Sequence, residues 1–145
     1  MRLSMKLLAT AAVMALSVSF AQAQQPPIKI GAVLSATGGA SFLGDPEKKT
    51  LEMYIADINA KGGINGRKVE VIIYDDASNP NNARTFATRL IEQDKVDAML
   101  AGSTTASSMA IIPLAEEAEI PLINFAGAVQ AVHPVKKWNF KTPHT

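Results

Sequence analysis

The sequence predicts an α/β protein built on a doubly wound parallel sheet with the strand order 2-1-3-4. Short apolar segments alternate with amphipathic stretches of helical length, which is typical of βαβ units. The two loops richest in glycine and hydroxyl residues, 35–44 and 102–105, follow the first and third of these apolar segments. In such a sheet both loops lie at the switch point, where ligands bind at the carboxyl ends of the strands.

The first 23 residues are predicted to be a secretory signal peptide. Arg2 and Lys6 give a basic start, residues 7–21 carry no charge, and Ala21-Gln22-Ala23 is an A-x-A cleavage site. Cleavage after Ala23 leaves one modest domain, residues 24–145, that we expect to be soluble and exported. This part has 12 basic and 13 acidic residues, no basic run and no cysteine. These features argue against a nucleic-acid partner and exclude a disulfide.

The first predicted strand and helix occupy residues 28–61. Residues 28–34 are apolar and form the strand, and residues 35–44 form the loop after it. Asp45 is predicted to cap the helix, with Pro46 at its first position. One buried face is predicted from four apolar residues at helical spacing: Leu51, Tyr54, Ile55 and Ile58.

A second strand and helix follow. Residues 68–74 carry alternating and consecutive β-branched residues and predict the strand. Asn79-Pro80 is predicted to open the helix. Its apolar face comprises Ala83, Phe86, Ala87, Leu90 and Ile91.

The last part of the chain predicts two further strands and a helix. The run from Val96 to Ala101 is typical of a strand buried on both faces of a parallel sheet. A helix then extends to about Ala118, with Ala110, Ile111, Leu114 and Ala115 as its apolar stripe. Residues 121–125 predict the fourth strand. Residues 138–141 resemble the start of another strand, after which the chain stops; we therefore expect an incomplete protein.

The turn after the third strand is the main candidate site. Gly102 is followed by Ser103, Thr104 and Thr105, directly before a helix. Free N–H groups, the positive end of the helix dipole and hydroxyls can together hold an anion there. A simple helix cap is the common role of such residues. The position opposite loop 35–44 favours a ligand contact in addition.

Catalytic and cofactor-binding patterns are missing from the sequence. There is no G-x-S-x-G elbow, dinucleotide fingerprint or phosphate-binding lysine loop, and His133 and His144 lie in late, proline-containing loops. Asp75 and Asp76 fit turn-forming and capping roles better than a metal site, because no histidine or further carboxylate joins them. We expect no enzyme activity, no cofactor and no metal. The remaining site suits a small carboxylate-bearing molecule such as an amino acid.

Four segments resemble the periplasmic leucine/isoleucine/valine-binding protein family, the substrate-binding components of branched-chain amino-acid ABC transporters. They are I-K-I-G-A-V-L-S-A-T-G, I-A-D-I-N-A-K-G-G-I-N-G-R-K-V-E-V-I-I-Y-D-D-A-S-N-P, A-G-S-T-T-A-S-S and P-L-A-E-E-A-E-I-P-L-I-N. The segment N-A-K-G-G-I-N-G with the following Y-D-D is specific for the family.

The resemblance implies a two-lobed periplasmic protein that closes on its ligand and delivers it to an ABC permease in the inner membrane. Residues 24–145 then correspond to most of the first lobe, and the second lobe is absent. The ligand contacts implied in the first lobe are Phe42 or Leu43 from the first loop, Ser103, Thr104 and Thr105 after the third strand, and Ala126, Gly127 and Ala128 after the fourth.

Two departures from the family pattern concern the ligand and the lobe's stability. Ala128 stands where close leucine binders often have a threonine, and the disulfide of some members is absent. The ligand therefore stays open between branched-chain amino acids and the amides, urea-like solutes and aromatic acids that the family also binds. A sensory module of the same fold is an alternative function.

Overall fold

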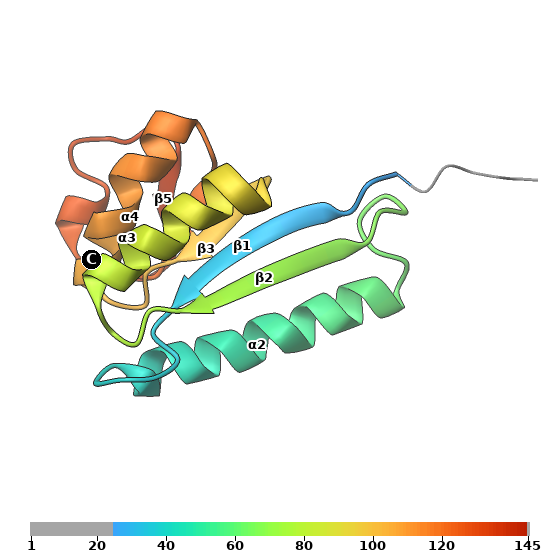
Figure 1. Cartoon of the computed structure of the whole chain (residues 1–145), viewed down its shortest axis with the longest axis horizontal. Helices are drawn as coiled ribbons and strands as arrows, with labels where there is room; N and C mark the ends of the chain where they lie inside the picture. Colours follow the sequence, from blue (N-terminus) through green and yellow to red (C-terminus); the bar gives the residue numbers. More distant parts are fainter. Residues whose placement is uncertain (1–24, 145) are drawn as a thin grey trace, which may run out of the picture.

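The computed structural model describes residues 25–144 and contains one five-stranded parallel sheet. The strand order is β2-β1-β3-β4-β5 (Figure 1). The strands are β1 Ile28–Leu34, β2 Val69–Asp75, β3 Ala98–Ala101, β4 Leu122–Asn124 and β5 Asn139–Lys141. The predicted order 2-1-3-4 is confirmed, and the segment predicted to start another strand pairs with β4 as β5.

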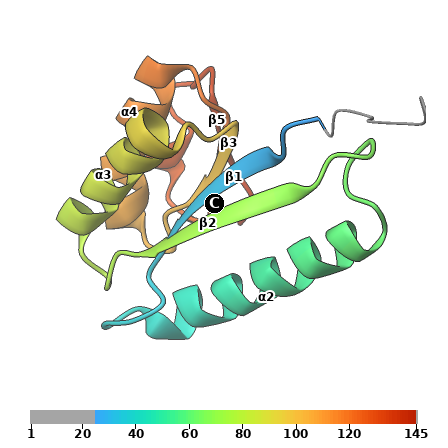
Figure 2. The same ribbon diagram turned by 45° about the vertical axis from the view of Figure 1, so that its right-hand side comes forward.

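The helices lie on both faces of the sheet. They are α2 Ser41–Ala60, α3 Pro80–Arg89, which continues as the π-helical turn η1 Leu90–Asp94, α4 Thr105–Ala118 and the 3₁₀ turn η2 Val129–Ala131. Figures 1 and 2 show α3 and α4 side by side on one face, and α2 alone on the other. The sheet is thus doubly wound, and helices cover its two faces unequally.

The hydrophobic core lies between the sheet and the pair α3 and α4. Alternate strand residues such as Met99 and Leu122 point to this face and are almost completely buried. The predicted helix faces meet them: Ala83, Ala87 and Leu90 from α3 and η1, and Ile111 and Ala115 from α4, are all 0 % exposed. The helical periodicity of these two segments therefore predicted the core correctly.

The opposite face is only partly covered, which corrects two predictions. Strand β3 is not buried on both faces, because Leu100 on the α2 side is only half-buried. On the same side Ile123 is 38 % and Phe140 is 55 % exposed. Helix α2 packs against β1 and β2 and leaves β3, β4 and β5 open. Its predicted buried face is consequently half-buried, and Tyr54 is 58 % exposed.

Helix α2 begins five residues earlier than predicted. Ser41 is its first residue, so Asp45 does not cap the helix and Pro46 lies inside it. Asp45 instead accepts a hydrogen bond from the Lys49 ammonium at 2.6 Å. The early start depends on Gly44, because a Cβ at this position would overlap the backbone carbonyl of Ser35. Without a side chain, the first turn of α2 can lie directly on the chain leaving β1.

The predicted signal peptide lies outside the described residues. Among residues 25–144, no helix has the length and apolar character needed to cross a membrane.

Candidate ligand-binding site

The two loops predicted to form the site lie next to each other. Strands β1 and β3 are parallel neighbours, with Val33 paired to Ala101, so their carboxyl ends meet at one edge of the sheet. The N–H of Ser35 donates to Ser103 Oγ at 3.0 Å, and the N–H of Gly102 donates to the Val33 carbonyl at 3.0 Å. Gly102 has φ of +83° and faces Ser108 too closely for any Cβ. The predicted switch-point geometry is therefore present.

The three hydroxyl residues before and at the start of α4 have different roles. Ser103 is 4 % exposed, and its hydroxyl donates to a carboxylate oxygen of Glu47. Thr104 is the N-cap of α4: its Oγ1 accepts the N–H of Ser107 at 3.1 Å. Thr105 is the first helical residue and is exposed. Of the three side chains, only Thr105 is turned to solvent at the edge of the sheet.

The adjacent carboxylates Asp75 and Asp76 organise the loops. Asp76 is 0 % exposed, accepts the Ser107 hydroxyl at 2.6 Å and so holds the first turn of α4. Asp75 accepts the Thr37 hydroxyl at 2.6 Å and the Ala77 N–H at 2.9 Å. Burial alone would raise the pKa of Asp75, but these hydrogen bonds outweigh it and hold the pKa below its usual 3.8. Both residues act as the turn-forming groups that the sequence favoured.

The remaining predicted contacts come from two other segments at the same edge. Phe42 is 73 % and Leu43 is 38 % exposed in the first turn of α2. After β4, Ala126 is buried, Gly127 is exposed and Ala128 is half-buried. The structure thus brings apolar groups of α2 to the sheet edge that also holds the N-terminus of α4.

Asn124 is a buried residue that shapes this edge and that the sequence did not single out. Its Oδ1 accepts the N–H of Ala126 at 3.0 Å, and its Nδ2 donates to Asn139 Oδ1 and to the Phe140 carbonyl, both at 2.8 Å. One side chain therefore fixes the loop after β4 and joins it to β5. A polar residue inside an otherwise apolar strand was the available signal.

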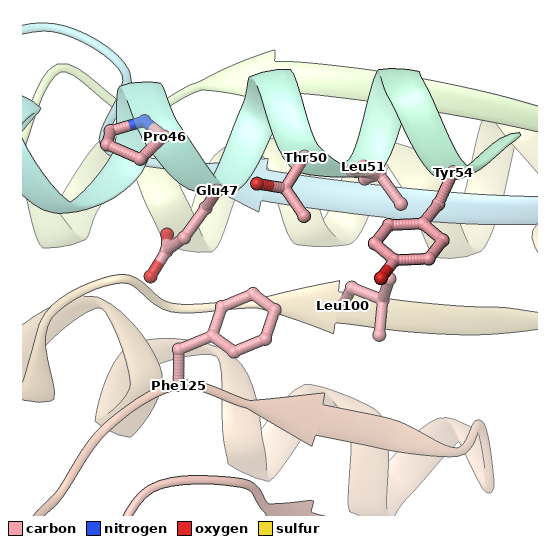
Figure 3. Close-up of a pocket in the computed structure, with 7 residues that line it drawn as sticks. All are labelled: Pro46, Glu47, Thr50, Leu51, Tyr54, Leu100 and Phe125. Carbon is pink, nitrogen blue, oxygen red and sulfur yellow. The ribbon is translucent and has the colours of Figure 1, made fainter. Parts of the chain in front are cut away.

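A largely apolar cleft of about 380 Å³ opens beside this edge, between α2 and the ends of β3 and β4. Figure 3 shows the rings of Tyr54 and Phe125 turned into it. The residues that line it are Pro46, Glu47, Thr50, Leu51, Tyr54, Leu100 and Phe125. None of the eight predicted contacts lines this cleft. It belongs to the uncovered face of the sheet, whereas the predicted contacts lie at the strand ends.

Glu47 connects the cleft to the predicted site. Its side chain leaves α2 and reaches toward the chain that follows β3 (Figure 3), where Ser103 donates to it. Burial raises the pKa of Glu47 above its usual 4.5, the Ser103 hydroxyl partly lowers it, and the charge of Asp76 raises it further. Sequence reasoning missed Glu47 because its partner Ser103 is 56 residues away, and no local pattern pairs them.

The arrangement provides hydrogen-bond donors and apolar surface. Thr104 caps the N–H of Ser107, so the N–H groups at the very start of α4, those of Thr105 and Ala106, are the ones that can face a ligand at the positive end of the helix dipole. Within residues 25–144 no group of three or more acidic, histidine or cysteine residues is placed to hold a metal ion. The geometry suits the binding of a small molecule with an anionic end.

Known proteins with similar sequences and structures are binding proteins. A family model described as periplasmic binding protein matches residues 27–144. The Leu/Ile/Val-binding protein homolog 7 of Brucella abortus is 34% identical over 119 residues, which cover 79% of this chain and 29% of that protein.

Two solved structures share the fold at about 30% identity. One is the branched-chain amino acid transporter substrate-binding protein LivJ of Streptococcus pneumoniae in complex with isoleucine, with a TM-score of 0.79 and 29% identity over 82% of this chain and 34% of that chain. The other is an ABC-transporter solute-binding protein of Rhodopseudomonas palustris in complex with 3,4-dihydroxybenzoic acid, with a TM-score of 0.73 and 30% identity over 82% of this chain and 32% of that chain. The chain spans about a third of the length of these proteins.

Proposed function

Because the chain belongs to the periplasmic binding protein family, in its leucine/isoleucine/valine-binding type, we propose that it recognises a branched-chain or related amino acid for an ABC transporter. In this proposal residues 24–145 are the N-terminal lobe of a two-lobed protein, and residues 1–23 are a signal peptide removed on export to the periplasm. The permease in the inner membrane is the partner that receives the ligand.

The observation that carries the proposal is the convergence of three loops at one edge of the sheet. The exposed Thr105 and the N-terminus of α4 provide donors for a carboxylate. The loop at Ala126, Gly127 and Ala128 provides backbone groups beside it. Phe42 and Leu43 provide apolar surface for the ligand's side chain. The lobe works by binding, and a second lobe would close over the ligand at a hinge.

A second ligand class is an aromatic acid. The similar R. palustris protein was solved with 3,4-dihydroxybenzoic acid, which has a carboxylate and no ammonium group. Ala128 has no hydroxyl to offer an ammonium group, and the 73 % exposed ring of Phe42 can stack on an aromatic ligand. Both ligand classes use the same carboxylate position at α4.

The test is a titration of the full 145-residue chain, followed by amide resonances, with L-leucine, L-isoleucine, L-valine, 3,4-dihydroxybenzoate and an aliphatic amide. We expect saturable shifts at Thr105 and Gly127 with one of these ligands. Thr105→Ala should weaken that binding, whereas the matched control Thr85→Ala, an exposed threonine on α3, should not. The absence of saturable shifts with every ligand would contradict the proposal that this lobe holds the ligand's carboxylate by itself.

A further inference from the structure

Glu47 and Ser103 form a link between three segments that are distant in sequence. The Ser35 N–H donates to Ser103 Oγ at 3.0 Å, and the same hydroxyl donates its single hydrogen to Glu47. The link therefore joins the end of β1, the turn before α4 and helix α2. Because its hydrogen is already donated, the Ser103 hydroxyl has none left for a ligand.

The N-terminus of α4 is held from two sides by carboxylates. Asp76, at the end of β2, accepts the Ser107 hydroxyl inside the first turn of α4. Glu47, on the α2 side of the sheet, accepts the Ser103 hydroxyl just before that turn. The capping hydroxyl of Thr104 lies between the two contacts and also donates to Ser107 Oγ at 3.2 Å. The direction of the free N–H groups of α4 thus depends on both carboxylates.

Among the described residues, Glu47 differs from the other acids of α2 in forming no ion pair with a lysine. Asp45, Glu52 and Asp57 each pair with a lysine one helical turn away. Glu47 forms no such pair among the described residues, although it is half-buried beside the apolar cleft. A carboxylate in this environment is costly unless it accepts hydrogen bonds, and the Ser103 hydroxyl is its hydrogen-bond partner.

From this geometry we propose that Glu47 is a positioning residue for ligand capture, which acts through Ser103 to set the turn that presents the N-terminus of α4. The proposal rests on the proposed function, because α4 is where the ligand's carboxylate binds. The hydrogen bond that Glu47 accepts carries the effect, and its side chain does not need to contact the ligand.

The experiment compares Glu47→Ala, Glu47→Gln, Ser103→Ala and the double variant of Glu47→Ala with Ser103→Ala in the full chain. Two readouts are measured: the amide resonances of Ser35 and Thr105, and the affinity for L-isoleucine and L-leucine. The control is Glu52→Gln, an exposed acid on the same helix. We expect Glu47→Ala to shift both resonances and to weaken binding about tenfold.

The conservative and double variants separate positioning from direct contact. Glu47→Gln keeps an oxygen that can accept the Ser103 hydrogen, and should restore most of the lost affinity and the original resonances. The double variant should weaken binding no further than either single variant, since all three remove the same link. Equal losses in Glu47→Gln and Glu47→Ala, with unmoved resonances, would overturn the proposal in favour of a direct charge contact.

The affinity measurement and the amide resonances test different proposals. If the wild-type chain binds neither amino acid, the proposal that this lobe captures these ligands is wrong. The resonances of Ser35 and Thr105 then still decide whether Glu47 sets the turn, because they are measured without ligand. Unchanged resonances in Glu47→Ala would overturn the positioning role in every case.

Discussion

The two faces of the sheet differ in how completely helices cover them. On one face α3 and α4 pack together over side chains such as Met99 and Leu122, which are 1 % and 0 % exposed. On the other, α2 lies alone over β1 and β2, and Ile123 and Phe140 of the next strands remain exposed. The first face contains the hydrophobic core. The second contains the cleft and the side chain of Glu47.

This difference separates the residues that stabilise the fold from the residues that we propose for ligand recognition. The apolar stripes of α3 and α4 pack against the sheet and stabilise the fold. Helix α2 is held less by side-chain burial than by its first turn, where Gly44 is its one buried residue. That turn also carries Phe42 and Leu43. The element that contributes least to the core therefore contributes most apolar surface to the candidate site.

The largest expected effect is on the covered face. Leu90→Ala should lower the free energy of unfolding by about 2–5 kcal/mol, because Leu90 is 0 % exposed and packs against Gly31 of β1. Urea denaturation measures the change. The matched control is Leu51→Ala on α2, which is half-buried and should lose clearly less. Equal losses of unfolding free energy in the two variants would show that both faces of the sheet contribute equally to stability.

The contact between α2 and the sheet should depend on Gly44. Gly44→Ala introduces a Cβ onto the backbone of Ser35, and we expect a loss of about 1–3 kcal/mol. Gly39→Ala is the control, since a Cβ there meets no atom within 4 Å. Thermal unfolding of the two variants measures both effects. A neutral Gly44→Ala would mean that the first turn of α2 moves freely away from β1.

Shortening an apolar side chain on the open face of the sheet should change the stability little. Phe140→Ala should cost less than about 1 kcal/mol, against about 3–5 kcal/mol for a buried phenylalanine, because its ring is 55 % exposed. Urea denaturation measures the change. A loss above 2 kcal/mol would indicate that another chain or segment covers this face in solution.

The smallest expected effect is the pH dependence contributed by Glu47. Its pKa is raised in the folded state, so the folded chain binds this proton more tightly than the unfolded chain. The resulting stability is fully present below the usual pKa of 4.5 and is lost as the pH rises through the folded pKa. The stability of Glu47→Gln should therefore fall less steeply above pH 4.5 than the stability of the wild-type chain. Urea midpoints measured at stepped pH test this, and parallel curves would contradict it.

Asp75 titrates in the opposite sense. Its pKa is lowered, so its contribution to stability is present above the usual 3.8 and is lost as the pH falls through the folded pKa. Glu47 therefore changes the stability above pH 4.5 and Asp75 changes it below pH 3.8, so the two contributions can be measured separately. Asp75→Asn should change the acid limb of the stability curve and leave the limb above pH 4.5 unchanged.

Local patterns predicted most of the fold. The strand bounds 28–34 are reproduced by β1, and Asn79 caps α3 with its side chain accepting the Asn81 N–H at 2.9 Å. These features depend on residues close in sequence, such as an apolar run or an Asn-Pro pair. The strand order also follows a general rule for doubly wound sheets, and the meeting of loops 35–44 and 102–105 follows from that order.

The features that were mispredicted depend on contacts between distant segments. An Asp-Pro pair is typical of a helix start, yet the approach of Gly44 to Ser35 moves the start of α2 to Ser41. Helical spacing cannot tell whether a neighbour is present to cover Tyr54. Similarly, the role of Ser103 is decided by Glu47, 56 residues away, and no local pattern pairs them. The assignment of ligand contacts among the eight predicted residues stays a prediction.

The strand order has a consequence for synthesis of the chain. After β1 and β2 have paired, β3 joins the free edge of β1, β4 joins β3, and β5 joins β4. No strand has to enter between two that are already bonded. A chain that becomes available from its N-terminus can therefore extend the sheet outward from β1 as each helix and strand is released, while among the described residues no later strand covers the outer edge of β2.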